Sequence, residues 1–205
     1  MKEIKNYFIT AISTDSGKTV ASAIVTHALN ADYWKPIQSG AETDSQEIKR
    51  LLPQTKIHKE AYLLTSPESP NSAAEKDNVS IKLGSIKLPH TDNHLIIEGA
   101  GGVLVPLNEK DVVGDIAHHL SLETIVVSNF YLGSINHTLL TIEVLKAKGI
   151  KIKGLIFNGE DPNHSKEIIL KKTGLQELLH ISTESVIDTD IIKKYAKELK
   201  EKQVV

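Results

Sequence analysis

Short apolar runs alternate with segments of helical spacing along most of this 205-residue chain. The runs are short enough for buried strands, and the segments between them repeat hydrophobic residues every three or four positions. This alternation predicts an α/β fold, a doubly wound, mainly parallel sheet with helices on both faces. The predicted strands are Tyr7–Ala11, Tyr33–Trp34, His94–Glu98, Thr124–Ser128 and Leu155–Phe157. The predicted helices are Lys18–Leu29, Asp44–Leu52, Ser72–Lys76, Val113–Leu120, a stretch from about Ser134 that Gly149 closes, Glu167–Lys172 and Asp190–Lys202.

Length and composition narrow the class of protein. At about 100–200 residues per domain, the chain is expected to form one domain, 1–205. The 24 Lys and Arg against 26 Asp and Glu give a net charge of −2, which argues against a strongly basic nucleic-acid binder. The chain has no cysteine, which excludes disulfides and thiolate zinc sites and fits a reducing compartment.

Neither a leader nor a membrane span is expected, so we predict a cytoplasmic protein without a membrane partner. Residues 1–6 are not followed by the apolar region of a signal peptide. The stretch Thr124–Ile142 lacks Asp, Glu, Lys and Arg over its 19 residues, which is almost the length of a membrane span. Because Ser128, Asn129 and Gly133 interrupt it, we interpret it as a strand, a loop and a helix.

The loop between the first predicted strand and helix ends in Gly17-Lys18-Thr19. Backbone N–H groups at a helix start lack intrahelical partners, and the helix dipole favours an anion there. Lys18 would supply a charge for the β- and γ-phosphates, and the Thr19 hydroxyl could hold Mg²⁺. The strict P-loop pattern lacks its first glycine, because Ile12 stands there. A solvated helix start is the alternative, but the strand–loop–helix context favours a phosphate site.

Further polar residues follow two other predicted strands. Glu98 ends one strand and precedes Gly99-Ala100-Gly101-Gly102, a run of small residues that suggests backbone close to a ligand. A carboxylate there suits a nucleotide-bound magnesium ion, although a solvated glutamate before a turn is the alternative. Asp44 fits a metal ligand or a helix cap equally well. Lys35 fits a catalytic cation, although on residue type alone a surface lysine is the better explanation.

Taken together and in this order, the loops resemble those of dethiobiotin synthetases, a P-loop family of ATP-dependent carboxylases in biotin synthesis. The Lys-Pro-x-Gln-Ser-Gly and Leu-Gly-x-Ile-Asn-His elements are far more specific than Gly-Lys-Thr. The resemblance covers the chain from about residue 7 to residue 158. The matching segments are Thr10–Thr19, Lys35–Gly40, Asp44, Ser69-Pro70 with Ala73-Ala74, Glu98–Gly102 with Val105–Leu107, Leu132–His137 and Asn158.

The resemblance implies an enzyme that joins 7,8-diaminononanoate, CO₂ and ATP into dethiobiotin, ADP and phosphate, with Mg²⁺ as cofactor. One amine takes up CO₂ to form a carbamate, and a carbamate oxygen attacks the γ-phosphate. The second amine then attacks the mixed anhydride, closes the cyclic urea and expels phosphate. Cations and N–H dipoles beside the triphosphate are expected to carry most of the catalysis.

The family's functional residues map onto this chain as follows. Lys18 and Lys35 would be catalytic, and Thr19, Asp44 and Glu98 would hold the metal. Thr14 and Ser39 would contact the carbamate or diamine, and Gly133, Ser134 and Asn136 of a homodimer partner would bind the substrate carboxylate. The expected nucleotide-binding residues are Thr14, Asp15, Ser16, Gly17, Lys18, Thr19, Val20, Asp44, Glu98, Gly99, Ala100, Gly101, Asn158 and Gly159. Asn158 would read the adenine.

Departures from the family pattern keep two rival functions open. Ala11 stands where the family usually has Gly, and its methyl group is expected to weaken nucleotide affinity. Ser13 replaces the usual Asp, and Ile181-Ser182-Thr183 replaces the usual Ile-Pro near the adenine. One rival is a partition- or positioning-type P-loop switch, but residues 11–16 lack the second lysine of that class. The other rival is a nucleotide-binding protein that has lost turnover.

Overall fold

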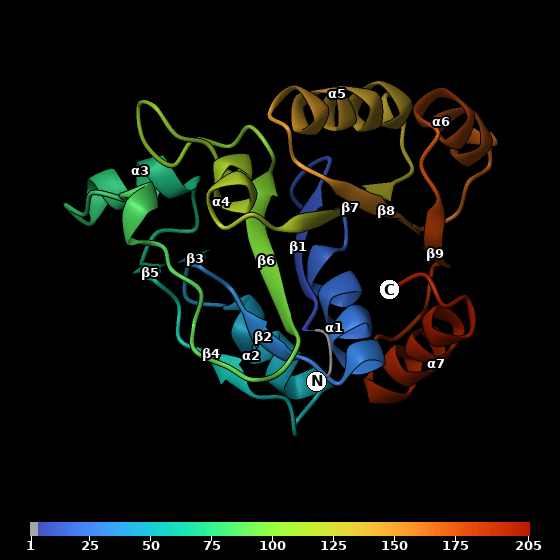
Figure 1. Ribbon diagram of the computed structural model, residues 1–205, viewed down its shortest axis with the longest axis horizontal. Helices are drawn as coiled ribbons and strands as arrows, with labels where there is room; N and C mark the ends of the chain where they lie inside the picture. The colour runs from blue at the N-terminus through green and yellow to red at the C-terminus, as the bar shows by residue number, and fades with distance from the viewer. Residues whose placement is uncertain (1–3) are drawn as a thin grey trace.

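The computed structural model describes residues 4–205, so the first three residues of the segment searched for a leader lie outside the described residues. Its centre is a parallel seven-stranded sheet with the order β4-β2-β6-β1-β7-β8-β9 (Figure 1). These strands are β1 (Asn6–Ala11), β2 (Asp32–Trp34), β4 (Ile57–His58), β6 (Leu95–Gly102), β7 (Glu123–Asn129), β8 (Ile152–Asn158) and β9 (Glu177–Ile181).

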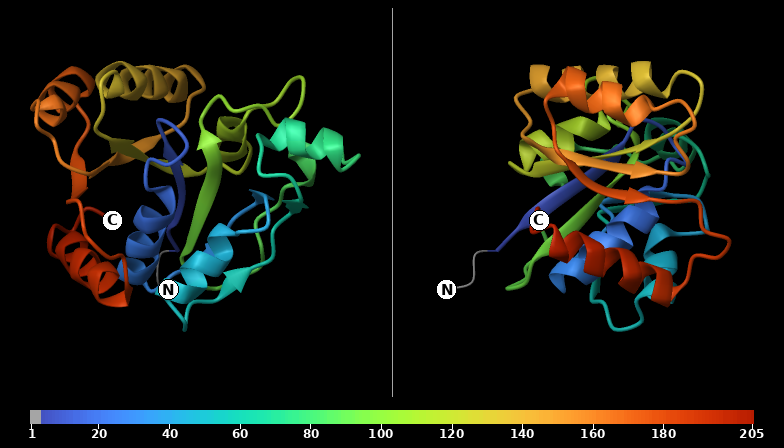
Figure 2. Two further views of the ribbon diagram at one scale, coloured as in Figure 1. Left: turned by 180° about the vertical axis from the view of Figure 1, so that it is seen from behind. Right: turned by 90° about the vertical axis from the view of Figure 1, so that its right-hand side faces the viewer.

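Helices cover both faces of the sheet, as the two further views show (Figure 2). One face carries α1 (Lys18–Leu29), α2 (Asp44–Leu51) and α7 (Thr189–Glu201). The other carries α3 (Pro70–Lys76), α4 (Val113–His119), α5 (Ser134–Ala147) and α6 (Ser165–Thr173), with the 3-10 turn η1 (Leu83–Ser85). The predicted doubly wound α/β class is therefore confirmed.

Alternate residues of the buried strands pack into two separate hydrophobic cores, one on each face of the sheet. In β1, Tyr7 and Ile9 pack in the core beneath α1, whereas Phe8 packs in the core beneath α4 and α5. This alternation follows from the two-residue period of a strand, which sends neighbouring side chains to opposite faces. The central strands are apolar throughout because both faces are covered.

The structure corrects several element boundaries. It adds β4, β9 and a small parallel pair made of β3 (Ile37–Ser39) and β5 (Tyr62–Leu64), none of which the sequence pattern predicted. The strand predicted to end at Glu98 continues through the following glycines as β6. An added Cβ at Gly99 would lie 2.8 Å from the Phe8 ring, so this small residue permits close packing of the strand ends.

The stretch Thr124–Ile142 forms β7, a loop and the first part of α5, as predicted. Within residues 4–205, no helix has the length and hydrophobicity needed to cross a membrane.

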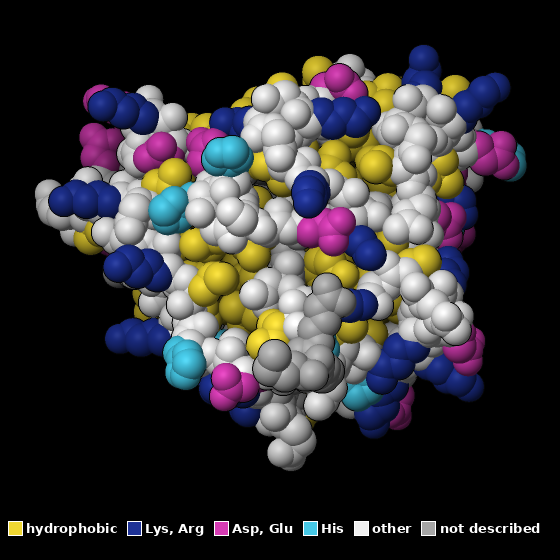
Figure 3. All heavy atoms as spheres, viewed as in Figure 1, with side chains coloured by type: hydrophobic (Ala, Val, Ile, Leu, Met, Phe, Trp, Pro, Cys, Tyr) yellow, Lys and Arg dark blue, Asp and Glu magenta, His cyan; other side chains and the backbone are white. Residues whose placement is uncertain are grey.

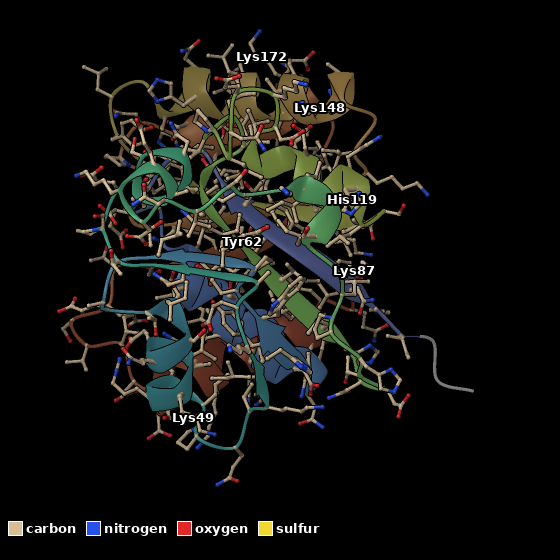
Figure 4. The ribbon with its side chains drawn as sticks, turned by 90° about the vertical axis from the view of Figure 1, so that its left-hand side faces the viewer. Lys49, Tyr62, Lys87, His119, Lys148 and Lys172 are labelled. Atoms are coloured by element: carbon tan, nitrogen blue, oxygen red, sulfur yellow. The ribbon has the colours of Figure 1, made fainter. Side chains whose placement is uncertain are left out.

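Charged side chains of both signs are dispersed over the surfaces in view. The face in Figure 3 carries hydrophobic side chains near its centre, with lysines and acidic residues intermingled around them. On another side, Lys49, Lys87, Lys148 and Lys172 lie apart from one another on separate segments (Figure 4). The face in Figure 3 therefore shows no broad field of positive charge.

Candidate active site

The loops after three neighbouring strands meet at the carboxyl edge of the sheet. Strand β6 lies between β1 and β2, and the pairs Ile9↔Glu98 and Tyr33↔Ile96 set their register. One residue beyond β2, Lys35 therefore comes level with Glu98. Two hollows of about 380 Å³ each open here, and Thr14, Lys35, Asp44 and Gly101 line both of them.

A buried ion-pair cluster lies where the two hollows adjoin. The Lys35 Nζ lies 2.6 Å from Asp44 Oδ2 and 3.1 Å from Glu98 Oε1, and it also donates to the Gly99 carbonyl at 3.1 Å. Burial alone would lower the pKa of Lys35, but the Glu98 and Asp44 carboxylates outweigh burial and raise it. Burial alone would raise the pKa of Asp44, but Lys35 outweighs burial and lowers it. Lys35 and Asp44 are therefore both charged near neutral pH.

The start of α2 shows that Asp44 is not the helix cap. Thr43 is the N-cap residue, and its hydroxyl accepts a hydrogen bond from the Gln46 backbone N–H in a complete capping box. Asp44 is the first residue of the helix, and its carboxylate faces Thr19 and Lys35 instead. The cap is thus separate from the Asp44 carboxylate.

Oxygen atoms suited to a divalent cation gather beside Thr19. Its hydroxyl lies 2.7 Å from Asp44 Oδ1 and 3.0 Å from Glu98 Oε1. A hydroxyl has one proton, so it cannot fully satisfy two carboxylate oxygens at once. Mg²⁺ takes one or two carboxylates together with hydroxyl, water and phosphate oxygens, so these residues fit that ion.

The phosphate loop joins β1 to α1. Lys18 is buried, its Nζ donates to the Ser13 carbonyl at 3.0 Å, and burial lowers the pKa of its ammonium. Gly17 begins the helix in the left-handed region with φ of 90°. Within the described chain, α1 has neither a side-chain cap nor an acidic residue in its first turn. Its amino end therefore suits an anion.

Strand β8 supports this loop from the side. The Asn158 side-chain amide donates to the Ser16 carbonyl at 3.1 Å. The φ of Gly17 favours glycine, and a Cβ added there would displace the Asn158 amide, whose Nδ2 would lie 2.3 Å away. The structure thus brings Asn158 to the phosphate loop, and its amide nitrogen is engaged with backbone. Gly159 follows it and donates its N–H to the Ile181 carbonyl.

The second hollow extends from Lys35 to Ser39 and Ser69. Its wall includes Val105 from the loop after β6. Within residues 4–205, the buried Ser39 hydroxyl oxygen has no hydrogen-bond partner. Such an oxygen can receive a ligand without losing an existing bond.

Most of the predicted nucleotide residues come together. The first of the two hollows lies at the phosphate loop and is called the phosphate hollow; it is lined by Thr14, Asp15, Gly17, Lys18, Thr19, Val20, Lys35, Asp44, Glu98 and Gly101. Ala100 lines the second hollow, and Gly99 contributes its carbonyl to Lys35. Ser16 is buried beneath the loop, where its hydroxyl donates to the Ser13 carbonyl.

The residues predicted for the substrate carboxylate lie elsewhere in the chain. Gly133, Ser134 and Asn136 form the start of α5 and line neither hollow. In this described segment, Gly133 has φ of 105°, no side chain caps the helix, and the first turn lacks acidic residues. The buried Ser134 hydroxyl has no hydrogen-bond partner within residues 4–205. This end is therefore suited to an anion, but one chain alone does not place it beside Lys35.

Two residues that touch the cluster were not among the predicted site residues, although Gln38 lies in the Lys-Pro-x-Gln-Ser-Gly element. Tyr33 donates its hydroxyl to Glu98 Oε2 at 2.9 Å, and Gln38 Oε1 accepts from the Asp44 backbone N–H at 3.1 Å. For Tyr33, the sequence signal was the two-residue period of a strand, which places its side chain on the same face as that of Lys35.

Comparison with known proteins assigns the family. A protein family described as an AAA domain matches residues 5–190. An ATP-dependent dethiobiotin synthetase of Cytophaga hutchinsonii is 56% identical over 200 residues, which cover 96% of this chain and 97% of the relative. The corresponding enzyme of Christiangramia forsetii is 46% identical, with 97% of each chain covered. The chain belongs to the ATP-dependent dethiobiotin synthetase family.

The fold of this chain also resembles the folds of solved structures. The cell division ATPase MinD of Pyrococcus furiosus superimposes with a TM-score of 0.63 at 14% identity, covering 97% of this chain and 99% of MinD. A putative plasmid partition protein of Borrelia burgdorferi gives 0.61 at 14% identity, covering 98% and 100%. At this identity the likeness shows the P-loop NTPase-like fold alone. The partition-type rival therefore shares the architecture, whereas sequence identity places the chain among dethiobiotin synthetases.

Proposed function

We propose that the protein catalyses ATP-dependent carboxylation and ring closure of 7,8-diaminononanoate with CO₂ to dethiobiotin, a step of biotin biosynthesis. The observation that best supports this proposal is that the Lys35 side chain is a buried cation where two hollows adjoin. One hollow has the groups that bind a triphosphate, and the other offers the unpartnered Ser39 hydroxyl. Family membership supports the same reaction.

The phosphate hollow binds the nucleotide in this proposal. Lys18 exchanges the Ser13 carbonyl for the β- and γ-phosphates, and the N–H groups at the start of α1 point at the same oxygens. Thr19, Asp44 and Glu98 would hold Mg²⁺, which supplies charge neutralisation at the triphosphate when bound. Asn158 keeps the loop in place through Ser16.

Lys35 serves the reacting atoms. One amine nitrogen attacks CO₂ and releases a proton to solvent, which yields a carbamate. A carbamate oxygen attacks the γ-phosphorus and expels ADP. The second amine then attacks the carbonyl carbon, and the expelled phosphate takes up the proton that this amine loses. Each step places negative charge near the Lys35 ammonium, which stabilises it without moving. Thr14 and Ser39 hydrogen-bond the carbamate or the diamine.

The proposal includes a homodimer whose partner completes each site. The start of α5 suits the substrate carboxylate but lies outside both hollows of its own chain. Beside α5, a hollow of about 530 Å³ is lined by Leu104, Val105 and Leu140. Leu104 and Leu140 are 54% and 55% exposed, and Leu132 is fully exposed next to Gly133. Covering this apolar surface with a second copy would bring the partner's helix end toward Lys35.

The decisive experiment is product formation from defined substrates. The purified protein is incubated with 7,8-diaminononanoate, ¹³C-bicarbonate, Mg²⁺ and each nucleoside triphosphate in turn. Mass spectrometry should find dethiobiotin carrying the label in its ureido carbonyl, with release of the nucleoside diphosphate. The variant Lys18→Ala should form none. Nucleotide hydrolysis that does not depend on the diamine, or binding without turnover, would favour the two rival functions. A cytoplasmic location is part of the same proposal.

A further inference from the structure

The Glu98 carboxylate has a different neighbour on each oxygen. Its Oε1 lies 3.0 Å from the Thr19 hydroxyl and 3.1 Å from Lys35 Nζ. Its Oε2 accepts a hydrogen bond from the Tyr33 hydroxyl at 2.9 Å. Both side chains are almost fully buried, so Tyr33 rather than solvent satisfies the second oxygen.

Tyr33 approaches Glu98 from the adjacent strand. It pairs with Ile96 across β2 and β6, and the strand period places Glu98 two residues farther on the same face. Its ring belongs to the apolar core beneath α1, together with Ile96. Packing thus fixes the ring, and with it the position of the hydroxyl oxygen.

In this hydrogen bond the Tyr33 hydroxyl donates and Glu98 Oε2 accepts. A hydrogen bond to a buried charged group is among the stronger ones in proteins.

We propose that Tyr33 is a positioning residue, whose hydroxyl holds Glu98 so that Oε1 faces Thr19, Lys35 and the metal site. Without this hydroxyl, Glu98 would turn one buried oxygen to an apolar ring edge, and rotation of its carboxylate would relieve that loss. Metal binding and the placement of Lys35 would both weaken. This inference rests on the proposed function, because it takes Glu98 as a metal ligand.

The test compares Tyr33→Phe with Tyr7→Phe. Both tyrosines are buried in the same hydrophobic core, but Tyr7 lies toward the amino end of β1 and lines neither hollow. Electron paramagnetic resonance measures Mn²⁺ binding to the protein–ADP complex, and product formation gives kcat and KM. In Tyr33→Phe, Mn²⁺ affinity and kcat should fall about 10- to 100-fold, the range for removal of a group that orients a ligand. The KM for the diamine should change less than about twofold, because its binding groups remain.

Each result decides the inference. It is overturned if Tyr33→Phe and Tyr7→Phe show equal Mn²⁺ affinity and kcat, or if the wild-type ADP complex binds no Mn²⁺. A wild-type protein that binds Mn²⁺ and ADP but makes no dethiobiotin contradicts the proposed function, while the Mn²⁺ comparison still tests Tyr33. If Tyr33→Phe does not fold, 3-fluorotyrosine at position 33 keeps the ring and changes the hydroxyl acidity. Because the more acidic phenol donates a stronger hydrogen bond to Glu98, Mn²⁺ affinity should shift measurably, and no shift relative to the same substitution at position 7 overturns the inference.

Discussion

Lys18 and Lys35 line the same phosphate hollow, but their surroundings act on them in opposite directions. Burial lowers the pKa of the Lys18 ammonium, whereas the carboxylates of Glu98 and Asp44 outweigh burial at Lys35 and raise its pKa. Before a nucleotide arrives, Lys18 has only a carbonyl oxygen within hydrogen-bond distance in the described chain, and Lys35 has two carboxylates. Lys18 thus has one neutral acceptor that a ligand could replace, whereas Lys35 is held in place by two carboxylates.

Replacing Lys35 by Ala should therefore lower turnover far more than ATP affinity. We expect kcat to fall at least about 100-fold, as when one electrostatic stabiliser is removed, and the Kd for ATP to change less than about threefold. Calorimetric ATP binding and the dethiobiotin assay measure the two effects. Lys49→Ala, on the surface of α2, is the matched control. A large loss of ATP binding with unchanged kcat would show that Lys35 serves the nucleotide instead.

At the scale of elements, β8 reaches the phosphate loop through the Asn158 side chain. Two roles for this residue give different outcomes in Asn158→Ala. Support of the loop through Ser16 predicts weaker binding of every nucleoside triphosphate, by roughly 10-fold for one lost hydrogen bond. Adenine recognition predicts a loss for ATP and little change for GTP. Because Asn158 Nδ2 donates to Ser16, we expect the general loss, and calorimetry with ATP and GTP distinguishes the two.

Asp32 ties β2 and the edge strand β4 to the segment before β6. Its carboxylate contacts His58, Thr91 and Asn93. Burial alone would raise the pKa of Asp32, but these hydrogen bonds outweigh burial and lower it. A lowered folded-state pKa stabilises the fold above the unfolded value and loses that contribution as the pH falls through the folded one.

The variant Asp32→Asn should consequently be less stable near neutral pH. The free energy of unfolding should fall by about 1–3 kcal/mol, the cost of a disrupted buried network. The difference should shrink below about pH 4, where the unfolded wild-type carboxyl takes up its proton. Urea unfolding at several pH values measures it, with the exposed neighbour Asp92→Asn as control. A deficit that is constant down to pH 2 would mean that the charge of Asp32 does not contribute.

The sequence pattern predicted the long buried strands and most helices because their hydrophobic period is strong. Strands β3 and β4 were missed because each is two or three residues long and exists only through its pairing with another segment. The meeting of Lys18, Lys35 and Glu98 was predictable, since parallel strands gather their carboxyl-end loops. The Tyr33 contact was not, because it depends on the register of β2 against β6.

At the scale of the whole molecule, one chain provides Lys35 and the other residues that line the phosphate hollow. The start of α5 in the same chain lies outside both hollows. The prediction of one domain, 1–205, stays a prediction. In a dimer with two-fold symmetry, the α5 end of each copy would serve the site of the other. Each site would then draw its charges from two subunits, the cations from one and the helix end from its partner.

A heterodimer that contains two different inactive variants tests this arrangement directly. Lys18→Ala removes the phosphate cation, and Asn136→Asp places a negative charge where the substrate carboxylate is expected to bind. Co-expression with two affinity tags yields heterodimers. If sites are shared, one of the two sites in each heterodimer has both parts intact, so activity should return to about half of the wild-type value. If each site lies within one chain, both sites carry a lesion and the heterodimer stays as inactive as its parents, because Lys18→Ala disables one chain and Asn136→Asp the other.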